Sequence, residues 1–129
     1  TPTEMRLARF DDQKVSDLQG IQWQLVNFWQ QKQTLPADLE ELADPISGWI
    51  NPLDPQSGEG YRYERTSNSS FKLCAEFNME SRNGGESMAV RAYDMMDGNW
   101  QHGVGEACFD RTIDPERYPP YQKPIPANL

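Results

Sequence analysis

Residues 11–32, DDQKVSDLQGIQWQLVNFWQQK, decide the fold of this chain. The stretch contains no proline and a single glycine, Gly20. Its apolar side chains recur at steps of three and four, which is the period of a helix with one apolar face. They are Val15, Leu18, Ile21, Leu25, Val26, Phe28 and Trp29. At about 1.5 Å per residue the helix would be about 33 Å long, so it can cross a small domain.

Signals on both sides set the limits of this helix. Upstream, we expect continuous helix from about Glu4, with a frayed start. Downstream, Pro36 ends it, because the residue before a proline avoids the helical region. Asp38 and Glu41 then have the spacing of a capping box, which predicts a short second helix over 39–43.

The later part of the chain is patterned for strands. Residues 61–65 and 71–77 both alternate polar with apolar side chains across a polar turn, which predicts a β-hairpin. The apolar residues of the second segment share one face, which we place on the helix, and Cys74 points to the other face. They are Phe71, Leu73, Ala75 and Phe77. With further strands expected at 87–93 and 106–109, the sequence predicts an α+β domain: a long N-terminal amphipathic helix on an antiparallel sheet of three or four strands.

The length of 129 residues fits one domain. Residues 44–60 are rich in proline and glycine and are interpreted as a loop, which its apolar residues are expected to pin to the domain. Five prolines between residues 111 and 129 favour an extended tail that lies on the surface or is disordered. We therefore assign residues 1–110 to a single domain and 111–129 to a Pro-rich tail.

Charge and hydropathy narrow the function classes. The net charge of −8 argues against nucleic acid and against docking on anionic lipid. It serves solubility, or it forms a surface for cations or a basic partner. No apolar run approaches the roughly 20 residues of a membrane span. The chain begins at Thr1 without an initiator Met, so we expect a processed or truncated chain whose missing signals carry no evidence of a cytoplasmic location.

The two cysteines, Cys74 and Cys108, allow two interpretations. They are two reduced, buried thiols or, as we favour for an exported chain, a disulfide. Their spacing fits no zinc site of the usual kind, because His102 alone cannot complete the ligands. If they are bonded, the C-terminal part is expected to return over the far side of the sheet.

The sequence contains no recognised catalytic motif, and we expect no enzyme. His102 is the only histidine, and we interpret it as a loop residue that holds backbone by hydrogen bonds rather than as a general base. Asp94, Asp97 and Asn99 are weak calcium candidates, because their spacing is not that of a calcium loop and a plain acidic turn explains them. No catalytic or cofactor-binding residue is assigned.

Paired carboxylates and one acceptor motif have plain explanations. Glu40-Glu41 and Asp11-Asp12 could be glycosidase pairs, but they lie near expected helix starts, where negative charge is favourable. Residues 68–70 match the three-residue acceptor for N-glycosylation, which is a weak signal.

The tryptophans are the candidates for partner contacts. Trp23 lies off the centre of the apolar stripe and is expected to be exposed, so it is the first candidate. Trp49 and Trp100 could line a ligand surface, and a solvent-exposed aromatic groove with Tyr93 would favour a binding domain. Trp29 is assigned to the core.

The chain resembles the periplasmic part of type IV pilin-like proteins, and among them the major pseudopilins of type II secretion. The likeness covers roughly residues 8 to 77: an amphipathic helix with regular charges, a Leu-Pro step, a loop with an Asp-Pro turn, and an antiparallel sheet. The residues that carry it are Ala8, Arg9, Asp12, Val15, Ser16, Asp17, Leu18, Ile21, Leu25, Phe28, Leu35, Pro36, Leu39, Leu42, Pro52, Leu53, Asp54, Pro55, Gly58, Tyr61, Tyr63, Phe71, Lys72, Leu73 and Cys74. The chain also resembles small, uncharacterised membrane-anchored bacterial proteins with an L-C-A-x-F strand and a later C-F pair, here Cys108-Phe109.

The resemblance implies an exported, non-enzymatic scaffold at the periplasmic or extracellular face, anchored by an apolar helix that would precede this chain. Its partners would be proteins or further copies of itself, with no nucleic acid. The alternative is a periplasmic ligand- or protein-binding sensor domain of a membrane protein. The pseudopilins carry a C-terminal aspartate-rich calcium loop, of which Asp94, Asp97 and Asn99 are a poor copy, and they lack the Cys74/Cys108 pair and this Pro-rich tail.

Overall fold

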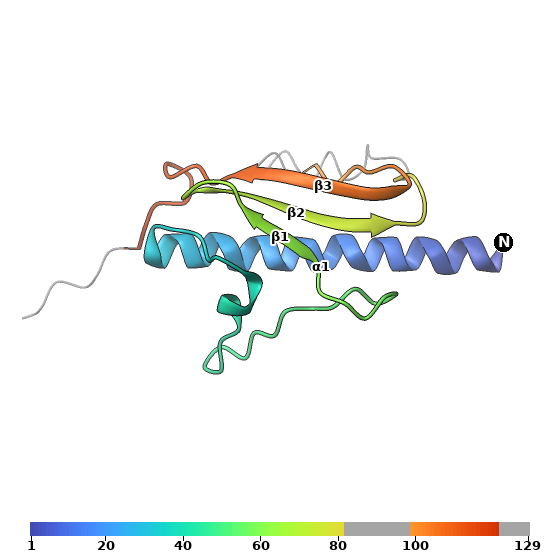
Figure 1. Cartoon of the computed structure of the whole chain (residues 1–129), viewed down its shortest axis with the longest axis horizontal. Coiled ribbons are helices and arrows are strands. Elements are labelled where there is room, and N and C mark those ends of the chain that lie inside the picture. Colours follow the sequence, from blue (N-terminus) through green and yellow to red (C-terminus); the bar gives the residue numbers. More distant parts are fainter. Residues whose placement is uncertain (82–98, 122–129) are drawn as a thin grey trace, which may run out of the picture.

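In a computed structural model, which describes residues 1–81 and 99–121, one long helix lies along a small antiparallel sheet (Figure 1). The helix, α1, spans Pro2–Lys32. Its first turn is capped by Thr1, whose side-chain oxygen accepts the N–H of Glu4 at 3.2 Å. It ends at Gln33, which adopts a left-handed conformation with φ of 57° and donates its N–H to the carbonyl of Trp29. The predicted helix is confirmed, and it begins two residues earlier than expected.

The apolar stripe of α1 faces the sheet. Leu18, Ile21 and Leu25 are fully buried, and Val26 and Trp29 are nearly so. Residues 2–10 of the helix are instead exposed or half-buried, and this end extends beyond the sheet (Figure 1). Only the part of α1 that carries the stripe is therefore covered.

The short second helix is present as a 3-10 helix, η1, over Leu39–Leu42. The expected capping box forms only in part. Among the described residues the Asp38 side chain caps no N–H of this turn, whereas the Glu41 carboxylate accepts the N–H of Ala37 at 2.7 Å. The prediction of Asp38 as the capping side chain was wrong, and the Glu41 carboxylate instead holds the backbone just before the turn.

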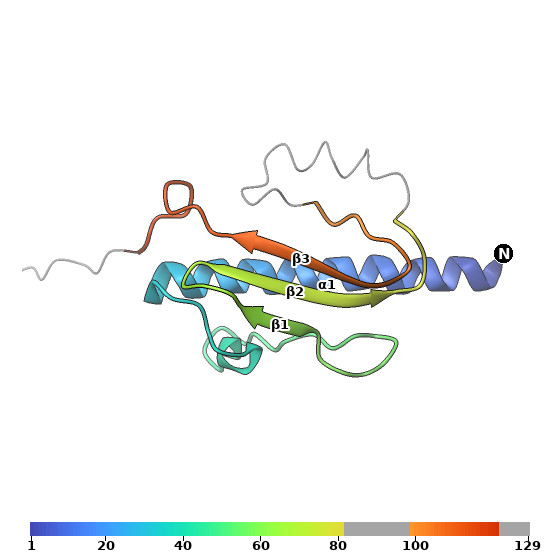
Figure 2. The ribbon, with the colours of Figure 1, turned by 45° about the horizontal axis from the view of Figure 1, so that its top comes forward.

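The sheet consists of three strands, β1 Arg62–Arg65, β2 Ser70–Phe77 and β3 Gly105–Thr112, in the order β1-β2-β3 (Figure 2). Both pairings are antiparallel. The hairpin of β1 and β2 is confirmed, and the strand expected at 106–109 is present and longer. The strand expected at 87–93 lies outside the described residues.

The core lies between α1 and the inner face of the sheet. All four inward-facing apolar residues of β2 are buried, as predicted, and both Phe71 and Leu73 have no exposed surface. Residues from the C-terminal part complete the core: Trp100, Phe109, Ile113 and Tyr118.

The expected boundary at residue 110 falls inside β3. Beyond the strand, Ile113 and Tyr118 are buried, and Tyr121 donates its N–H to the carbonyl of Gln30 on α1 at 2.7 Å. The tail as far as residue 121 therefore packs along the helix, because its aromatic and aliphatic side chains find apolar surface there.

The loop 44–60 is attached by one of the four apolar residues that were expected to pin it. The other three, Ile46, Ile50 and Leu53, are 96%, 81% and 56% exposed. The contact is made by Trp49, whose ring lies over Gly20 of α1, at 3.4 Å from where a Cβ on that glycine would stand. The absence of a side chain at Gly20 thus makes room for the ring.

Candidate functional site

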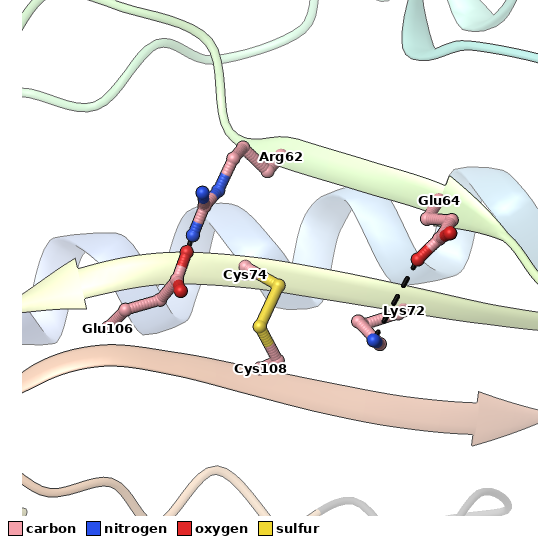
Figure 3. The surroundings of a disulfide bond; sticks show 6 residues. All are labelled: Arg62, Glu64, Lys72, Cys74, Glu106 and Cys108. Carbon is pink, nitrogen blue, oxygen red and sulfur yellow. Dashed lines mark ion pairs between the residues drawn. A yellow bond between two sulfur atoms is a disulfide. The ribbon is translucent and has the colours of Figure 1, made fainter.

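The outer face of the sheet, turned away from α1, carries a disulfide between Cys74 and Cys108 (Figure 3). The two residues stand directly opposite each other in the β2–β3 register, with their Cα atoms 4.1 Å apart. The predicted disulfide is confirmed, but the expected route of the chain was wrong. Because β3 lies beside β2 in the same sheet, the bond joins neighbouring strands and no segment has to cross the far side.

Two ion pairs flank the disulfide on the same face (Figure 3). Arg62 of β1 pairs with Glu106 of β3, and Lys72 of β2 pairs with Glu64 of β1, with Nζ and Oε1 3.7 Å apart. All four side chains are well exposed, so each pair contributes only about 0–1 kcal/mol to stability. Together with Tyr63 and the two cysteines they line a shallow hollow of about 410 Å³.

A larger groove of about 650 Å³ adjoins this hollow and shares Arg62, Cys74 and Glu106 with it. Its lining includes Lys14 of α1, which is 2% exposed. The Lys14 ammonium donates to the side-chain oxygen of Gln56 and to the carbonyl of Glu76, both at 2.7 Å, and lies 3.6 Å from the Asp54 carboxylate. A buried ammonium needs such partners, since desolvation of an unpaired charge is costly.

Asp11, one turn before Lys14, is a second buried charge. Its carboxylate accepts the backbone N–H groups of Asn78 and Met79 and the side-chain amide of Asn78, at 2.9–3.0 Å. These bonds tie the end of β2 to α1. The two neighbouring carboxylates therefore differ in environment: Asp11 is a buried hydrogen-bond acceptor for backbone N–H groups, and Asp12 is exposed.

Two tyrosines anchor β1 and the residue before it. Tyr61 donates its hydroxyl to Asp17 at 2.6 Å, and Tyr63 donates to the carbonyl of Pro36 at 2.7 Å. Burial, together with the hydrogen bond to Asp17, raises the pKa of Tyr61 well above its ordinary value. Burial raises the pKa of Tyr63 to about 12, although the charge of Arg65 acts in the opposite direction.

The ring of His102 takes part in packing. It stacks on Phe77, with ring centroids 3.6 Å apart and planes at 14°. The backbone N–H of His102 donates to the Ser81 side chain, and its carbonyl accepts the N–H of Ser81.

The structure does not bring the predicted tryptophans together. Trp23 is 49% exposed, as expected, and meets Tyr118 edge to face. Trp100 was expected at a ligand surface but is buried at 7% exposure. Its ring lies against Phe109 and under the Arg111 guanidinium, 4.5 Å from the ring centre.

The other candidate residues from the sequence do not form a common site among the described residues. Asp94, Asp97 and Tyr93 lie outside the described residues. Asn99 uses its side-chain oxygen to accept the N–H of Gln101 and its carbonyl to accept from Arg111. Glu40 and Glu41 belong to η1, and the acceptor motif at 68–70 lies at the turn between β1 and β2.

The burial of the polar residues Lys14, Gln22 and Arg111 was not predicted from the sequence, and neither was that of Asp11 and Asp54. Lys14 lies at helical spacing from the stripe but was placed outside it, and Gln22 was assigned to neither face. Arg111 was assigned to the tail, yet its Nε donates to the Gln22 side chain at 3.0 Å across the core. The available signal was the spacing: Lys14, Leu18, Ile21 and Leu25 continue one face of the helix.

Comparisons with protein-family models, curated proteins and solved structures found no match to this chain. The disulfide suggests an oxidising, extracytoplasmic location. Within residues 1–81 and 99–121, no helix combines the length and the apolar character needed to cross a membrane.

Proposed function

We propose that this chain is a non-enzymatic, extracytoplasmic domain of a pilin- or pseudopilin-like protein. A segment preceding α1 would anchor it in the membrane, and the domain would act in assembly or in other protein–protein contacts. The observation that carries the proposal is the shape of α1: one unbroken helix of 31 residues, covered by the sheet along its later part and uncovered along residues 2–10.

The uncovered end of α1 has the composition of a contact surface. Met5 is 58% exposed, and Arg6 and Arg9 follow it within about one turn. An apolar side chain with cationic neighbours suits a helix that packs beside acidic protein surfaces. The chain itself supplies such a surface, since it carries a net charge of −8.

The proposal of a scaffold also rests on what the candidate catalytic groups do. The ring of His102 is stacked on Phe77, and the Asp11 and Lys14 charges are committed to partners that hold α1 to the sheet and the loop. These groups stabilise the fold, which is their role in a scaffold.

Site-specific photo-crosslinking tests this function. A benzoylphenylalanine is introduced at Met5 in the natural gene product in its own cells, with Gln31, exposed at the opposite end of the same helix, as the matched control. We expect discrete crosslinks to another copy or to one protein partner from position 5 and far fewer from position 31. Equal, weak labelling from both positions would contradict the proposal.

A second candidate function, a ligand-binding sensor domain, is supported by the groove over Lys14. Its lining carries both signs of charge and includes Arg62, Asp54 and Glu59. A small polar ligand bound there would raise the melting temperature of the isolated domain in a compound screen, and an Arg62→Ala variant would lose that shift. A silent screen, together with crosslinks from position 5, would favour the scaffold.

A further inference from the structure

The disulfide differs from an ordinary covalent staple in its place in the sheet. Cys74 and Cys108 are already opposed by the backbone ladder of β2 and β3, which continues for eight paired positions. Hydrogen bonds on both sides of the pair thus hold the two strands in register independently of the sulfurs. After reduction, the two thiols would remain side by side on one rigid surface.

The bond is also open to attack from one side. Cys108 is exposed, whereas Cys74 is 7% exposed, and both border the hollow of about 410 Å³ on the outer face. Arg62 and Lys72 line the same hollow together with their ion-pair partners Glu106 and Glu64, so its charges balance. An incoming thiolate therefore meets Cys108 first, and Cys74 is the leaving sulfur.

A third ligand atom lies next to the sulfurs. The sulfurs of Cys74 and Cys108 and a carboxylate oxygen of Glu106 all lie within 4.8 Å of one another. A tetrahedral zinc ion, about 2.3 Å from sulfur and about 2.1 Å from oxygen, holds its ligands about 3.5–3.8 Å apart, so small side-chain rotations suffice. Three protein ligands leave the fourth position to water, which removes the need for the further Cys or His ligands that the sequence lacks.

We infer that the Cys74–Cys108 pair is a reversible redox couple whose reduced form, with Glu106, binds a thiophilic divalent metal ion such as Zn²⁺ on the outer face of the sheet. A dithiol reductant supplies the two electrons. One of its thiolates attacks Cys108, breaking the S–S bond and releasing Cys74, which takes up a proton. Its second thiolate then attacks the reductant sulfur of the mixed disulfide and releases Cys108, which takes up the second proton, so the reductant leaves as a disulfide.

Metal binding then displaces the two thiol protons, and Glu106 exchanges Arg62 for the ion. The oxidised chain has no free thiolates and cannot form the site. The site is therefore present or absent according to the redox state, and Arg62 competes with the metal for the Glu106 carboxylate.

The test uses the whole 129-residue chain, reduced with a phosphine that leaves no competing thiol, and Cd²⁺ as the probe. We expect one Cd²⁺ per chain, with the ultraviolet charge-transfer band of cadmium–thiolate bonds, in reduced protein and no band in oxidised protein. Glu106→Gln should weaken binding by at least about tenfold. Glu64→Gln, the same change in the neighbouring ion pair, should leave it within about twofold.

Arg62→Gln gives an independent readout, because removing the competitor should tighten Cd²⁺ binding by up to about fivefold. Circular dichroism of the reduced chain, recorded alongside, reports whether the fold persists. The inference is overturned if reduction unfolds the chain, if folded reduced protein shows no cadmium–thiolate band, or if the Glu106 and Glu64 variants bind equally.

Discussion

The two faces of the central strand β2 are held by different forces. On the inner face, Phe71 and Leu73 have no exposed surface and pack toward α1. On the outer face, Lys72 takes part in an exposed ion pair and Cys74 in a disulfide. Alternation along a single strand thus separates burial of apolar area from specific pairwise bonds.

This difference between the two faces separates the source of stability from the groups that can react. Burial of apolar area is strong but lacks direction, so the inner face fixes which side of the sheet meets the helix. Pairwise bonds are directional and depend on conditions such as redox state and salt, so the outer face can respond to its surroundings. The following predictions test this separation.

The largest effect is expected on the inner face. Phe71→Ala removes a fully buried ring at the centre of the core and should lower the free energy of unfolding by about 3–5 kcal/mol. Urea denaturation followed by circular dichroism measures the change. Phe71→Leu, which keeps most of the apolar volume, should lose much less, and equal losses would show that the ring is not part of a packed core.

Removal of the disulfide should come next. The bond spans 34 residues of sequence, and a Cys74→Ala/Cys108→Ala double variant should lose about 2–4 kcal/mol. Since the β2–β3 ladder remains, the variant should still unfold in a single transition with a similar denaturant slope. A variant that is unfolded in the absence of urea would show that the bond, rather than the inner face, holds β3 in place.

The buried charge at the edge of the inner face should rank third. Asp11→Ala leaves three N–H donors of Asn78 and Met79 without their carboxylate and should cost about 2–3 kcal/mol. Asp12→Ala, its exposed neighbour, is the matched control and should cost no more than about 1 kcal/mol, as expected for an exposed charge. Similar losses in both variants would argue against the buried role of Asp11.

Tyr61 is expected to make the stability of the domain depend on pH in the alkaline range. Tyr61→Phe loses one hydrogen bond to Asp17 and should cost about 1–2 kcal/mol near neutral pH. In the wild type, the raised pKa means that the folded chain keeps a proton that the unfolded chain releases near pH 10. The unfolded state then binds fewer protons, so stability falls as the pH rises above about 10.

The Tyr61→Phe variant lacks the loss of stability that is due to Tyr61. The free energies of unfolding of the wild type and the variant, measured by urea denaturation as a function of pH, should therefore converge as the pH rises. Tyr63, with its pKa raised to about 12, contributes a further loss between about pH 10 and 12 in both proteins. Parallel curves over this range would mean that the Tyr61 hydroxyl is not held in its neutral form by the fold.

The same contrast explains how far the sequence could be read. The helix and the inner face of the hairpin were predictable, because the periods of 3.6 and 2 report which side chains are buried. The disulfide between Cys74 and Cys108 was also predictable from the sequence. Their position as direct neighbours across β2 and β3 was not, since register depends on where β3 enters the sheet.

Buried polar contacts were the main loss. Lys14 and Arg111 are expected to be solvent-exposed from their residue type. Only the folded chain shows that Lys14 donates a hydrogen bond to Gln56 and Arg111 to Gln22. The Pro-rich segment misled for a related reason: its prolines indicate an extended backbone correctly, but Ile113 and Tyr118 bury that backbone against the helix.

The smallest effect is expected from the outer-face ion pair between Glu64 and Lys72. Both side chains are exposed and the charged atoms are 3.7 Å apart, so Glu64→Gln should change the free energy of unfolding by less than about 0.5 kcal/mol. Added salt should erase even this difference, because screening acts most strongly on exposed charges. A loss comparable to that of Phe71→Ala, persisting in high salt, would mean that the outer face contributes to stability through its charges, and the separation between the two faces would fail.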